Sequence, residues 1–529
     1  MKYYRDLREY ITALEANNKL YRIKREINKD TETMPLVRCQ FRGLPESERK
    51  AFLFENVVDA VGKRYGVPLL VASHAPSRDV YAMGMMCKPE EIPDRWTEAQ
   101  IHPIEPVVVE DSLVQQEVHV GDNLLEHGGL EEFPIPISTP GFDNAPYLTA
   151  ANWVTKDPES GIRNVGNYRS MVKSKDRVGI CLLSPSQHMA VHLAKYRSLG
   201  LPAMPAAVVI GATPNIGLTA ASKVPYGMDE YAVAGAIAGE PVQLVKCKTV
   251  DIEVPASAEI VLEGEIPTSY LEREAPFGEF HGHMGMESMN PYFEITCITH
   301  RKNPIYNAFI SQFPPSESSK LRQVSGEAIY YKFLKQDCNI PGILGVALHE
   351  ESGVSSIIIV RLRKIYSAQP WQVLNATTAY APNRGKIIIV VDEDIDPRDL
   401  DSVFWAVSWR VQPHRDIQVI PGKSMGLDYS TVQPRQTRRL GEPVPGSAML
   451  IDATKKWDYP PVSLPRKEFM EAALKIWDEE GLPKLSLKTP WHGYSLGLWT
   501  EENQEEAELA LKGQHYQTGE KTARNREKT

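Results

Sequence analysis

Cysteine is scarce in this sequence and widely spaced. The six cysteines are scattered singly over 529 residues, and no two of them form a CxxC pair. Disulfide frameworks and zinc–thiolate sites both need cysteines in closer groups. The sequence therefore argues against both and favours a protein of a reducing compartment.

Long apolar runs and signal-peptide features are also missing. No uninterrupted apolar stretch approaches the ~20 residues that a membrane-spanning helix requires. Residues 1–23 lack an apolar core followed by a small-residue cleavage site. We therefore expect a cytoplasmic protein that has no membrane partner.

Positive charge is not in excess. Lysine and arginine number 59 and aspartate and glutamate 68, which gives a net charge of −9. A protein whose main partner is nucleic acid needs a basic field for phosphate contacts. The balance argues against such a partner but leaves room for a local basic pocket that binds a small anion.

Two common enzyme signatures are absent. His188 and His192 have the i, i+4 spacing of a helical metal site, but they lack the glutamate of HExxH, so a zinc hydrolase of that type is excluded. One ligand, two ligands or structural histidines all stay open for this pair. No GxGxxG follows an expected strand, which argues against the usual dinucleotide site.

The patterns that are present predict an α/β protein. A single core stops growing near roughly 250–300 residues, so a chain of this length should hold two or three domains. Leu7, Ile11 and Leu14 lie on one face of an expected helix, and residues 228–238 predict a second helix closed by Gly239.

The middle of the chain is rich in expected strands. Residues 206–210 predict a buried strand, and residues 254–260 alternate like a half-buried one. Prolines interrupt residues 132–140 and predict an irregular segment.

After residue 315 the sequence predicts a separate α/β unit. It has a helix at 320–336 and β-branched strands at 357–360 and 387–391. The acidic run 392–396 is interpreted as an ordinary helix start. The last thirty residues are dense in charge and predict a solvated or disordered tail.

Two carboxylates flank a predicted turn in the segment 273–283. Glu274 and Glu279 are five residues apart around Pro276 and Gly278, which can aim both side chains into one cavity. A carboxyl with a raised pKa beside a second acid and an arginine is a workable proton donor. A solvated surface loop explains the same pattern equally well.

Three further side chains could hold an anion or a metal. Asn164 and Arg169 end a short strand-like run, where a cross-strand salt bridge is the simpler role for the arginine. Glu230 begins the helix at 228–238, where helix capping is the simpler role. Asn164, His188 and Glu230 together would instead suit magnesium or manganese that bridges a phosphate.

Taken in order, these fragments resemble one family. The chain contains the blocks NVGNYR, SPSQH, ASKVP with MDEYAVAG, VKCKTVDIEVPASAEIVLEGEI and EREAPFGEFHGHMG. Their content and order are similar to the UbiD decarboxylases over roughly residues 1–460, and most strongly over 164–285.

The resemblance implies a catalytic set and a cofactor site. Arg169, Glu274 and Glu279 match the family's Arg–Glu–Glu set, with Glu279 as proton donor and acceptor. The implied cofactor is prenylated FMN, which forms a covalent adduct with the substrate. Residues implied to bind the cofactor are Asn164, Arg169, Gln187, His188, Val224, Pro225 and Glu230.

The resemblance also implies two cations and a substrate pocket. Asn164, His188 and Glu230 would bind Mn²⁺ or Mg²⁺. Main-chain carbonyls of Ala221, Ser222 and Val224, together with Glu230, would bind K⁺. Phe280 and Leu427 would face the substrate.

The implied fold is α/β (α+β), with a flavin-binding domain built on a split β-barrel and a C-terminal α/β oligomerisation domain. We expect an N-terminal α/β region at 1–115, the flavin domain at 116–315, the oligomerisation domain with its linking helix at 316–470, and a helical, charged tail at 471–529. A homo-oligomer, either a dimer or a hexamer, is implied.

The implied reaction is reversible, non-oxidative decarboxylation of an aromatic, heteroaromatic or α,β-unsaturated acid. An aryl-CoA such as phthaloyl-CoA stays open, because Lys173, Lys175 and Arg177 could form a basic rim. A flavin prenyltransferase would supply the cofactor. The alternatives are an ordinary FMN oxidoreductase and a non-catalytic subunit of a multi-subunit carboxylase.

Overall fold

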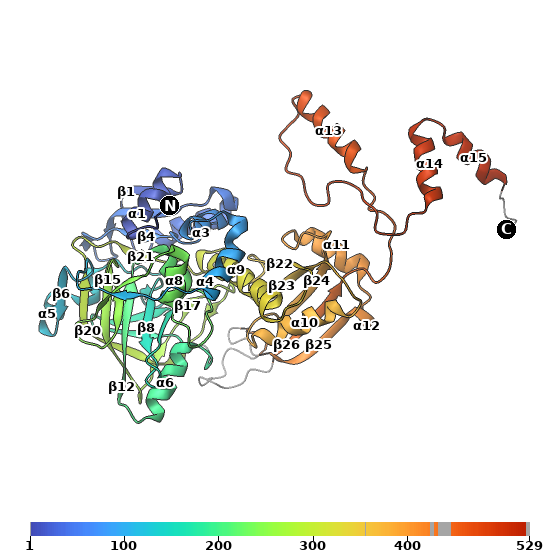
Figure 1. The fold of residues 1–529 in the computed structure, drawn as a ribbon. Helices are drawn as coiled ribbons and strands as arrows, with labels where there is room; N and C mark the ends of the chain where they lie inside the picture. The colour runs from blue at the N-terminus through green and yellow to red at the C-terminus, as the bar shows by residue number, and fades with distance from the viewer. Residues whose placement is uncertain (1, 183, 355, 424–427, 432–445, 525–529) are drawn as a thin grey trace.

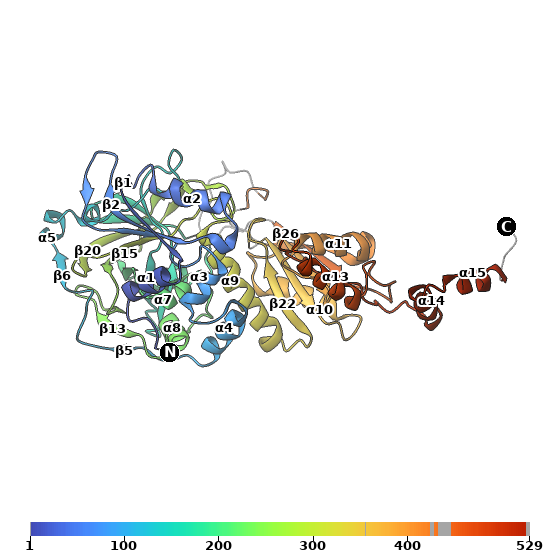
Figure 2. The same ribbon diagram turned by 90° about the horizontal axis from the view of Figure 1, so that it is seen from above.

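The computed structural model describes residues 2–182, 184–354, 356–423, 428–431 and 446–524. Figure 1 shows the first three hundred residues gathered around one large sheet, with a second, smaller α/β body beyond helix α9. Figure 2 gives the view from above, in which the last two helices, α14 and α15, extend away from both bodies. The mixed α/β fold class expected from the sequence is confirmed.

The N-terminal layer is a five-stranded sheet. Its order is β1-β2-β4-β21, and β3 pairs with β2. The strands are β1 (Leu20–Asn28), β2 (Ala51–Val58), β3 (Arg64–Tyr65), β4 (Leu69–Val71) and β21 (Tyr306–Ala308). Helix α1 (Leu7–Ala16) buries Leu7, Ile11 and Leu14, which confirms the first predicted helix. The remaining helices here are α2 (Thr33–Gly43), α3 (Arg78–Gly84) and α4 (Ile92–Ile101).

A nine-stranded antiparallel sheet forms the centre of the molecule. Its order is β7-β10-β11-β20-β15-β12-β8-β9, and β6 pairs with β20. The strands are β6 (Glu117–Val120), β7 (Tyr147–Leu148), β8 (Asn152–Lys156), β9 (Arg163–Asn167), β10 (Ser170–Ser174), β11 (Arg177–Ile180), β12 (Ala203–Ile210), β15 (Ile260–Pro267) and β20 (Tyr292–His300). Strand β12 confirms the buried strand predicted at 206–210.

The core of this sheet is apolar and fully packed. Trp153 is buried, and its indole Nε1 donates to the Tyr168 carbonyl at 3.1 Å and to Ser170 Oγ at 3.1 Å. A Cβ on Gly166, which stands opposite Trp153 on β9, would lie 2.5 Å from the Tyr168 ring. Glycine is therefore required at this position for the ring to pack.

The predicted half-buried strand at 254–260 is wrong. The structure has two strands there, β14 (Glu253–Pro255) and β15, joined by a turn. Val254, Ala256, Ala258 and Ile260 are all buried. The alternation of apolar and polar residues arises where the buried chain turns from β14 into β15. It does not mark a single strand with one solvent-exposed face.

Short elements surround the central sheet. They are α5 (Asp122–Glu126), η3 (Gly129–Glu132), α6 (His188–Ser198), α7 (Pro214–Ala220), α8 (Glu230–Ala238), β5 (Val107–Val108), β13 (Gln243–Lys246), β16 (Glu272–Glu274), β17 (Phe277–Gly278), β18 (Met284–Gly285) and β19 (Ser288–Asn290). Helix α8 ends at Gly239 in a left-handed conformation, as the sequence predicts. Residues 133–140 form no helix or strand, which confirms the irregular segment.

Helix α9 (Glu317–Lys332) links the central body to the second one, and it packs on both α4 and β22. The second body is a mixed sheet of order β22-β23-β24-β26-β25. Its elements are η4 (Phe333–Asp337), β22 (Ile343–Leu348), β23 (Ile357–Leu362), α10 (Gln369–Tyr380), β24 (Ile387–Asp392), α11 (Leu400–Arg410), α12 (Pro413–Asp416), β25 (Ile417–Lys423) and β26 (Gly446–Ala453).

The acidic run 392–396 is not the helix start that the sequence predicts, because α11 begins after its N-cap Asp399. Asp392 and Asp394 instead bind the buried Arg410. Arg410 Nη1 lies 2.7 Å from Asp392 Oδ2 and 2.8 Å from Asp394 Oδ1, and Arg410 Nη2 lies 2.6 Å from Asp394 Oδ2. The run therefore forms a buried ion-pair cluster.

Replacing Arg410 with methionine should lower the free energy of unfolding by about 3–5 kcal/mol, because two partly buried carboxylates lose their counter-charge. Urea unfolding of the second body measures the change in its free energy of unfolding. Arg363→Met removes an exposed pair with Glu393, just beyond the ends of β23 and β24, and should cost less than about 1 kcal/mol. Equal losses in the two variants would contradict the expectation.

The C-terminal segment is helical. It contains α13 (Lys467–Glu479), α14 (Glu501–Leu511) and α15 (His515–Arg524), and none of the three buries a residue. The solvated and helical character is as expected, and the disordered alternative does not hold for residues 501–524, which form two helices. Within the described part of the chain, no helix has the length and apolar character needed to cross a membrane.

Candidate functional site

Arg169 is the centre of a buried charged cluster. It lies in the short connection between β9 and β10, and its Nε and Nη2 donate to the two oxygens of Glu274 at 3.0 and 2.9 Å. Its Nη1 contacts Glu279 Oε1. The Glu274 side chain is fully buried and that of Glu279 is 7% exposed. The structure thus brings together the three side chains that the sequence predicts as a set, and the solvated-loop alternative is wrong.

The loop between the two glutamates is held in a bent conformation. Ala275 has a φ of 81°, which is rare for a residue other than glycine and turns the chain between Glu274 and Glu279. The loop is anchored from segment 143–147: Asn144 Nδ2 donates to the Ala275 carbonyl, and Tyr147 Oη donates to the Pro276 carbonyl. These contacts fix both carboxylates toward Arg169.

Close packing holds the guanidinium in place. Its Cζ lies 5.0 Å from the centroid of the Phe277 ring, within cation–π range. A Cβ on Gly285, which pairs with Phe277, would lie 2.8 Å from Arg169 Nη1. Any larger residue at 285 would therefore displace the arginine.

The cluster lies among groups whose protonation is shifted by burial. Burial raises the pKa of Glu279, and the negative charge of Glu274 adds to this, while Arg169 and Arg322 oppose it. Burial raises the pKa of Asp143 to about 6, against hydrogen bonds from the Thr139 and Gly278 amides. Glu279 therefore holds a proton more readily than an exposed glutamate does.

A neutral histidine lies beside these acids. Burial lowers the pKa of His281 to about 4, and the charges of His283 and Arg169 lower it further. His281 Nδ1 accepts the His283 amide at 3.3 Å, so the ring carries its proton on Nε2. Among the described residues, nothing pairs with this buried Nε2.

Asn164, His188 and Glu230 meet at a second place. Asn164 lies on β9, and His188 and Glu230 begin α6 and α8. His188 Nδ1 is 3.7 Å from Glu230 Oε1, and Glu230 Oε2 accepts the Val165 amide at 2.7 Å. Burial raises the pKa of Glu230, and these two contacts oppose the rise. The N-cap of α8 is Asp229, so capping is not the role of Glu230.

This second place fits a small cation. A cavity of about 20 Å³ is lined by Asn164 and His188, which is room for about one ion or water. Asn164 is buried, and within the described chain its Nδ2 has no hydrogen-bond partner. An amide, an imidazole and a carboxylate are suitable donors for manganese or magnesium. His192 lines the same cavity but is bonded to Thr155 Oγ1 at 2.9 Å.

The other residues predicted to bind the cofactor or potassium lie in two segments that lead into residues lining this cavity, His188 and Tyr226. Gln187 is the N-cap of α6, and its Oε1 accepts the Ser184 amide at 3.0 Å. Ala221, Ser222, Val224 and Pro225 lie in the connection from α7 to α8, which leads directly to Glu230. Val224 is buried, and Pro225 is exposed.

One of the two predicted substrate-pocket residues is described. Phe280 follows Glu279, and the Arg322 guanidinium on α9 lies 4.3 Å from its ring centroid. Burial lowers the pKa of Arg322 to about 10, which Glu279 opposes. Leu427 lies outside the described residues.

Sequence reasoning missed the residues that support this cluster. Asp143 accepts a hydrogen bond from the Gly278 amide at 3.2 Å. The Phe277 ring contacts Arg169, and Arg322 contacts the Phe280 ring. Asp143 and Arg322 come from segments far from the Glu274–Glu279 loop, and no local motif marks Arg322. The Gly-Phe-Asp-Asn turn at 141–144 was the available signal.

Two family models match the chain. Residues 107–314 match the 3-octaprenyl-4-hydroxybenzoate carboxy-lyase Rift-related domain (UbiD), and residues 321–453 match the 3-octaprenyl-4-hydroxybenzoate carboxy-lyase C-terminal domain. An uncharacterised protein of Aquifex aeolicus is 32% identical over 514 residues, which covers 90% of this chain and 99% of that protein.

Solved structures resemble it over the same span. An evolved dimeric form of the UbiD-class enzyme HmfF from Pelotomaculum thermopropionicum, in complex with prFMN, is 29% identical with a TM-score of 0.75, and the match covers 89% of this chain and 100% of that one. Vanillic acid decarboxylase of Sedimentibacter hydroxybenzoicus in its closed form is 29% identical with a TM-score of 0.78, and the match covers 90% and 100%.

Proposed function

This chain belongs to the UbiD family of carboxy-lyases, and on that premise we propose that it removes CO2 from an aromatic or heteroaromatic acid with prenylated FMN as its cofactor. The observation that carries the proposal is the buried Arg169–Glu274–Glu279 cluster in the region that matches the family model. Solved relatives include a complex with prFMN and a vanillic acid decarboxylase.

Each member of the cluster has a distinct role in the proposal. Glu279 donates the proton that replaces CO2 on the substrate carbon, which its raised pKa favours. Glu274 fixes the guanidinium plane through two hydrogen bonds, so Arg169 can orient Glu279 and attract the substrate carboxylate. Prenylated FMN, when bound, supplies the electron sink that no side chain offers for a carbanion.

The cofactor phosphate is proposed to lie beside Asn164, His188 and Glu230, which would hold Mn²⁺ or Mg²⁺. The burial of Asn164 and Glu230 and the 3.7 Å contact of His188 with Glu230 support this. Gln187 at the start of α6 would contact the phosphate. The connection that contains Ala221, Ser222, Val224 and Pro225 would hold K⁺ through its carbonyls and border the cofactor.

A free acid is favoured over a CoA thioester as substrate. The basic rim that a thioester would need is already neutralised: Lys173 and Arg177 pair with Glu272, and Lys175 pairs with Glu131. Phe280 offers an apolar ring surface, and neutral His281 offers a donor for a ring substituent. A planar acid with a polar ring substituent fits these groups best.

We also propose that the chain forms a homo-oligomer. Large apolar side chains are exposed on the C-terminal elements, with Trp409 and Phe404 of α11 at 70% and 55% and Ile476 of α13 at 58%. Large apolar side chains exposed together on one helix, as on α11, mark an interaction surface. The predicted domain limits and cytoplasmic location stay predictions.

The Trp409→Glu variant should elute as a smaller species than the wild type, because a charge on this face opposes association. Light scattering after size exclusion measures the mass against the 59.3 kDa of one chain. Trp371→Glu is unsuitable as a control because Trp371 packs against the core, so exposed Tyr516→Glu on α15 serves instead. A wild type that is already monomeric would contradict the proposal.

The proposed function is tested by co-expression with a flavin prenyltransferase, which is the expected cofactor supplier. The extracted flavin is identified by mass and absorbance, and CO2 release is assayed on hydroxybenzoic, heteroaromatic and cinnamic-type acids and on aryl-CoA thioesters. Prenylated flavin with turnover of a free acid supports the proposal. Ordinary FMN with NAD(P)H oxidation would favour an oxidoreductase, and inactivity of the prenylated-flavin form would favour a subunit role.

A further inference from the structure

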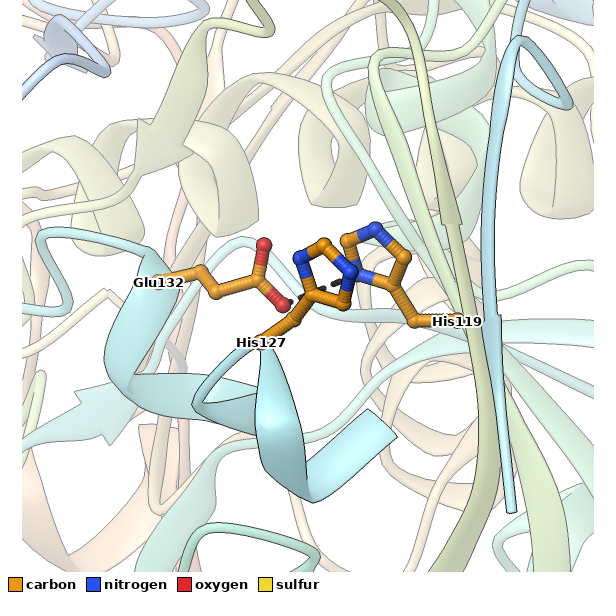
Figure 3. A group of neighbouring side chains, drawn as sticks. All are labelled: His119, His127 and Glu132. Atoms are coloured by element: carbon orange, nitrogen blue, oxygen red, sulfur yellow. Dashed lines mark hydrogen bonds and ion pairs between the residues drawn. The ribbon is translucent and has the colours of Figure 1, made fainter. Parts of the chain in front are cut away.

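A second group of metal-binding side chains lies away from the site described above. His119 is on β6, His127 is the C-cap that follows α5, and Glu132 ends η3. One ligand atom from each lies within 4.8 Å of the others. Figure 3 shows the two imidazole rings face to face, with the Glu132 carboxylate pointing toward them. Three different elements thus converge on one point.

A fourth residue, His300 on β20, faces the same carboxylate. Its Nδ1 lies 2.8 Å from the Arg301 carbonyl oxygen, which can only accept, so Nδ1 carries a proton and Nε2 is the atom turned toward the carboxylate. His300 is 8% exposed, and no described residue donates to its Nε2. That nitrogen is 3.8 Å from Glu132 Oε2.

Among the described residues, the His300 Nε2 and the Glu132 carboxylate therefore face each other without a hydrogen bond. Leaving a buried polar atom without a hydrogen-bond partner costs free energy. The nearby Lys63 ammonium is bonded to the Glu131 carbonyl. A cation placed between the imidazoles and the carboxylate would satisfy both groups.

We propose that His119, His127 and Glu132 bind one zinc ion or a similar transition-metal ion. Two imidazole donors beside a carboxylate suit zinc, whereas potassium and calcium prefer oxygen donors alone. His300 is adjacent and can serve as the fourth ligand. Such a site would tie the edge strand β6 and the α5–η3 segment to β20.

The geometry requires a small adjustment in one ligand. The His119 and His127 rings are stacked 3.9 Å apart at 11°, so their lone pairs do not yet converge. His127 is exposed at the end of α5 and its ring can turn. His119 is buried and is already held by Glu132 Oε1 at 3.0 Å from its Nδ1. Rotation of the exposed His127 side chain can therefore bring the lone pairs together.

This site is separate from the cation site proposed for the cofactor. His119 lies on β6, which pairs with β20, whereas Asn164 lies on β9. Strands β15, β12 and β8 lie between β20 and β9 in the sheet. None of the four side chains contributes to the Arg169 cluster. Metal binding here can therefore be measured without any flavin chemistry.

The test is titration of the chelator-treated full-length chain with Zn²⁺ alone, followed by calorimetry, with Co²⁺ absorbance as a second readout. The His188→Ala background removes the other proposed cation site. In that background we expect one equivalent of Zn²⁺ per chain and a higher Tm when zinc is present. Absence of saturable binding would overturn the proposal.

Single substitutions then assign the ligands. His127→Ala and Glu132→Gln should each weaken Zn²⁺ binding by more than about 100-fold and abolish the rise in Tm. His414→Ala, an exposed histidine on α12, is the matched control and should bind as tightly as its parent. His127 is exposed, so its loss should not prevent folding. Unchanged affinity in both ligand variants would overturn the assignment.

Discussion

The Glu279→Gln variant is expected to lose about 10²–10⁴-fold in kcat while it retains bound flavin. Glutamine keeps the size of the side chain and its contact with Arg169, but it cannot deliver a proton. Burial raises the pKa of Glu279 and the adjacent Glu274 charge does the same, against Arg169 and Arg322, which suits a proton donor. CO2 release measures kcat, and flavin absorbance measures cofactor content.

Glu272→Gln is the matched control for this variant. Glu272 lies in the same segment, but it pairs with Lys173 and Arg177 at the surface and does not contact Arg169. It should keep kcat within a few-fold of the wild type. Wild-type turnover in Glu279→Gln would remove the proton-donor role.

The same assignment predicts the pH dependence. The protonated form of Glu279 is the donor, so kcat should be high below its pKa and should fall as pH rises through it. Because that pKa is raised, the fall should occur at higher pH than for an exposed glutamate. The Glu279→Gln variant should lack this limb in its residual activity.

The His188→Ala variant is expected to lose the bound metal and the flavin together. His188 is one of three proposed ligands, and removal of a direct ligand should weaken metal binding by more than about 100-fold. The buried Glu230 would then lose its 3.7 Å contact with the imidazole as well. Metal analysis and flavin absorbance of the purified protein measure both losses.

His192→Gln tests the specificity of that result. His192 lies one turn further along α6 and lines the same cavity, but it is bonded to Thr155 Oγ1. Glutamine can keep a hydrogen bond there, so metal and flavin should remain at wild-type levels. Full flavin occupancy in His188→Ala would exclude His188 from the ligand set.

Local patterns were sufficient for the elements that bury one face. Leu7, Ile11 and Leu14 predicted α1, and Gly239 marked the end of α8. The pattern at 254–260 misled because both faces are buried there, so alternation carried no information about solvent. The charged residues at 501–524 form helices despite their lack of an apolar face, since helix propensity and a capping box at Thr500 are enough locally.

The candidate site was only partly predictable. The spacing of Glu274 and Glu279 allowed a solvated loop, and the resemblance to a family was needed to place Arg169 beside them. The structure adds that Ala275 adopts a left-handed conformation and that segment 143–147 holds the loop. Such long-range contacts leave no periodic or spacing signal, which is why Asp143 and Arg322 were not found.

Strand β21 has a consequence for the order in which the chain folds during synthesis. Tyr306 of β21 pairs with Leu69 of β4, so the ribosome must add about 237 residues before β4 obtains its second neighbour. At ~5–20 residues per second this takes roughly 10–50 s. During that time the apolar strand Leu69–Val71 presents an open edge, which is the kind of surface that chaperones bind and that neighbouring nascent chains can pair with. The N-terminal sheet is therefore synthesised first, but its pairing is complete only after β21 has been synthesised.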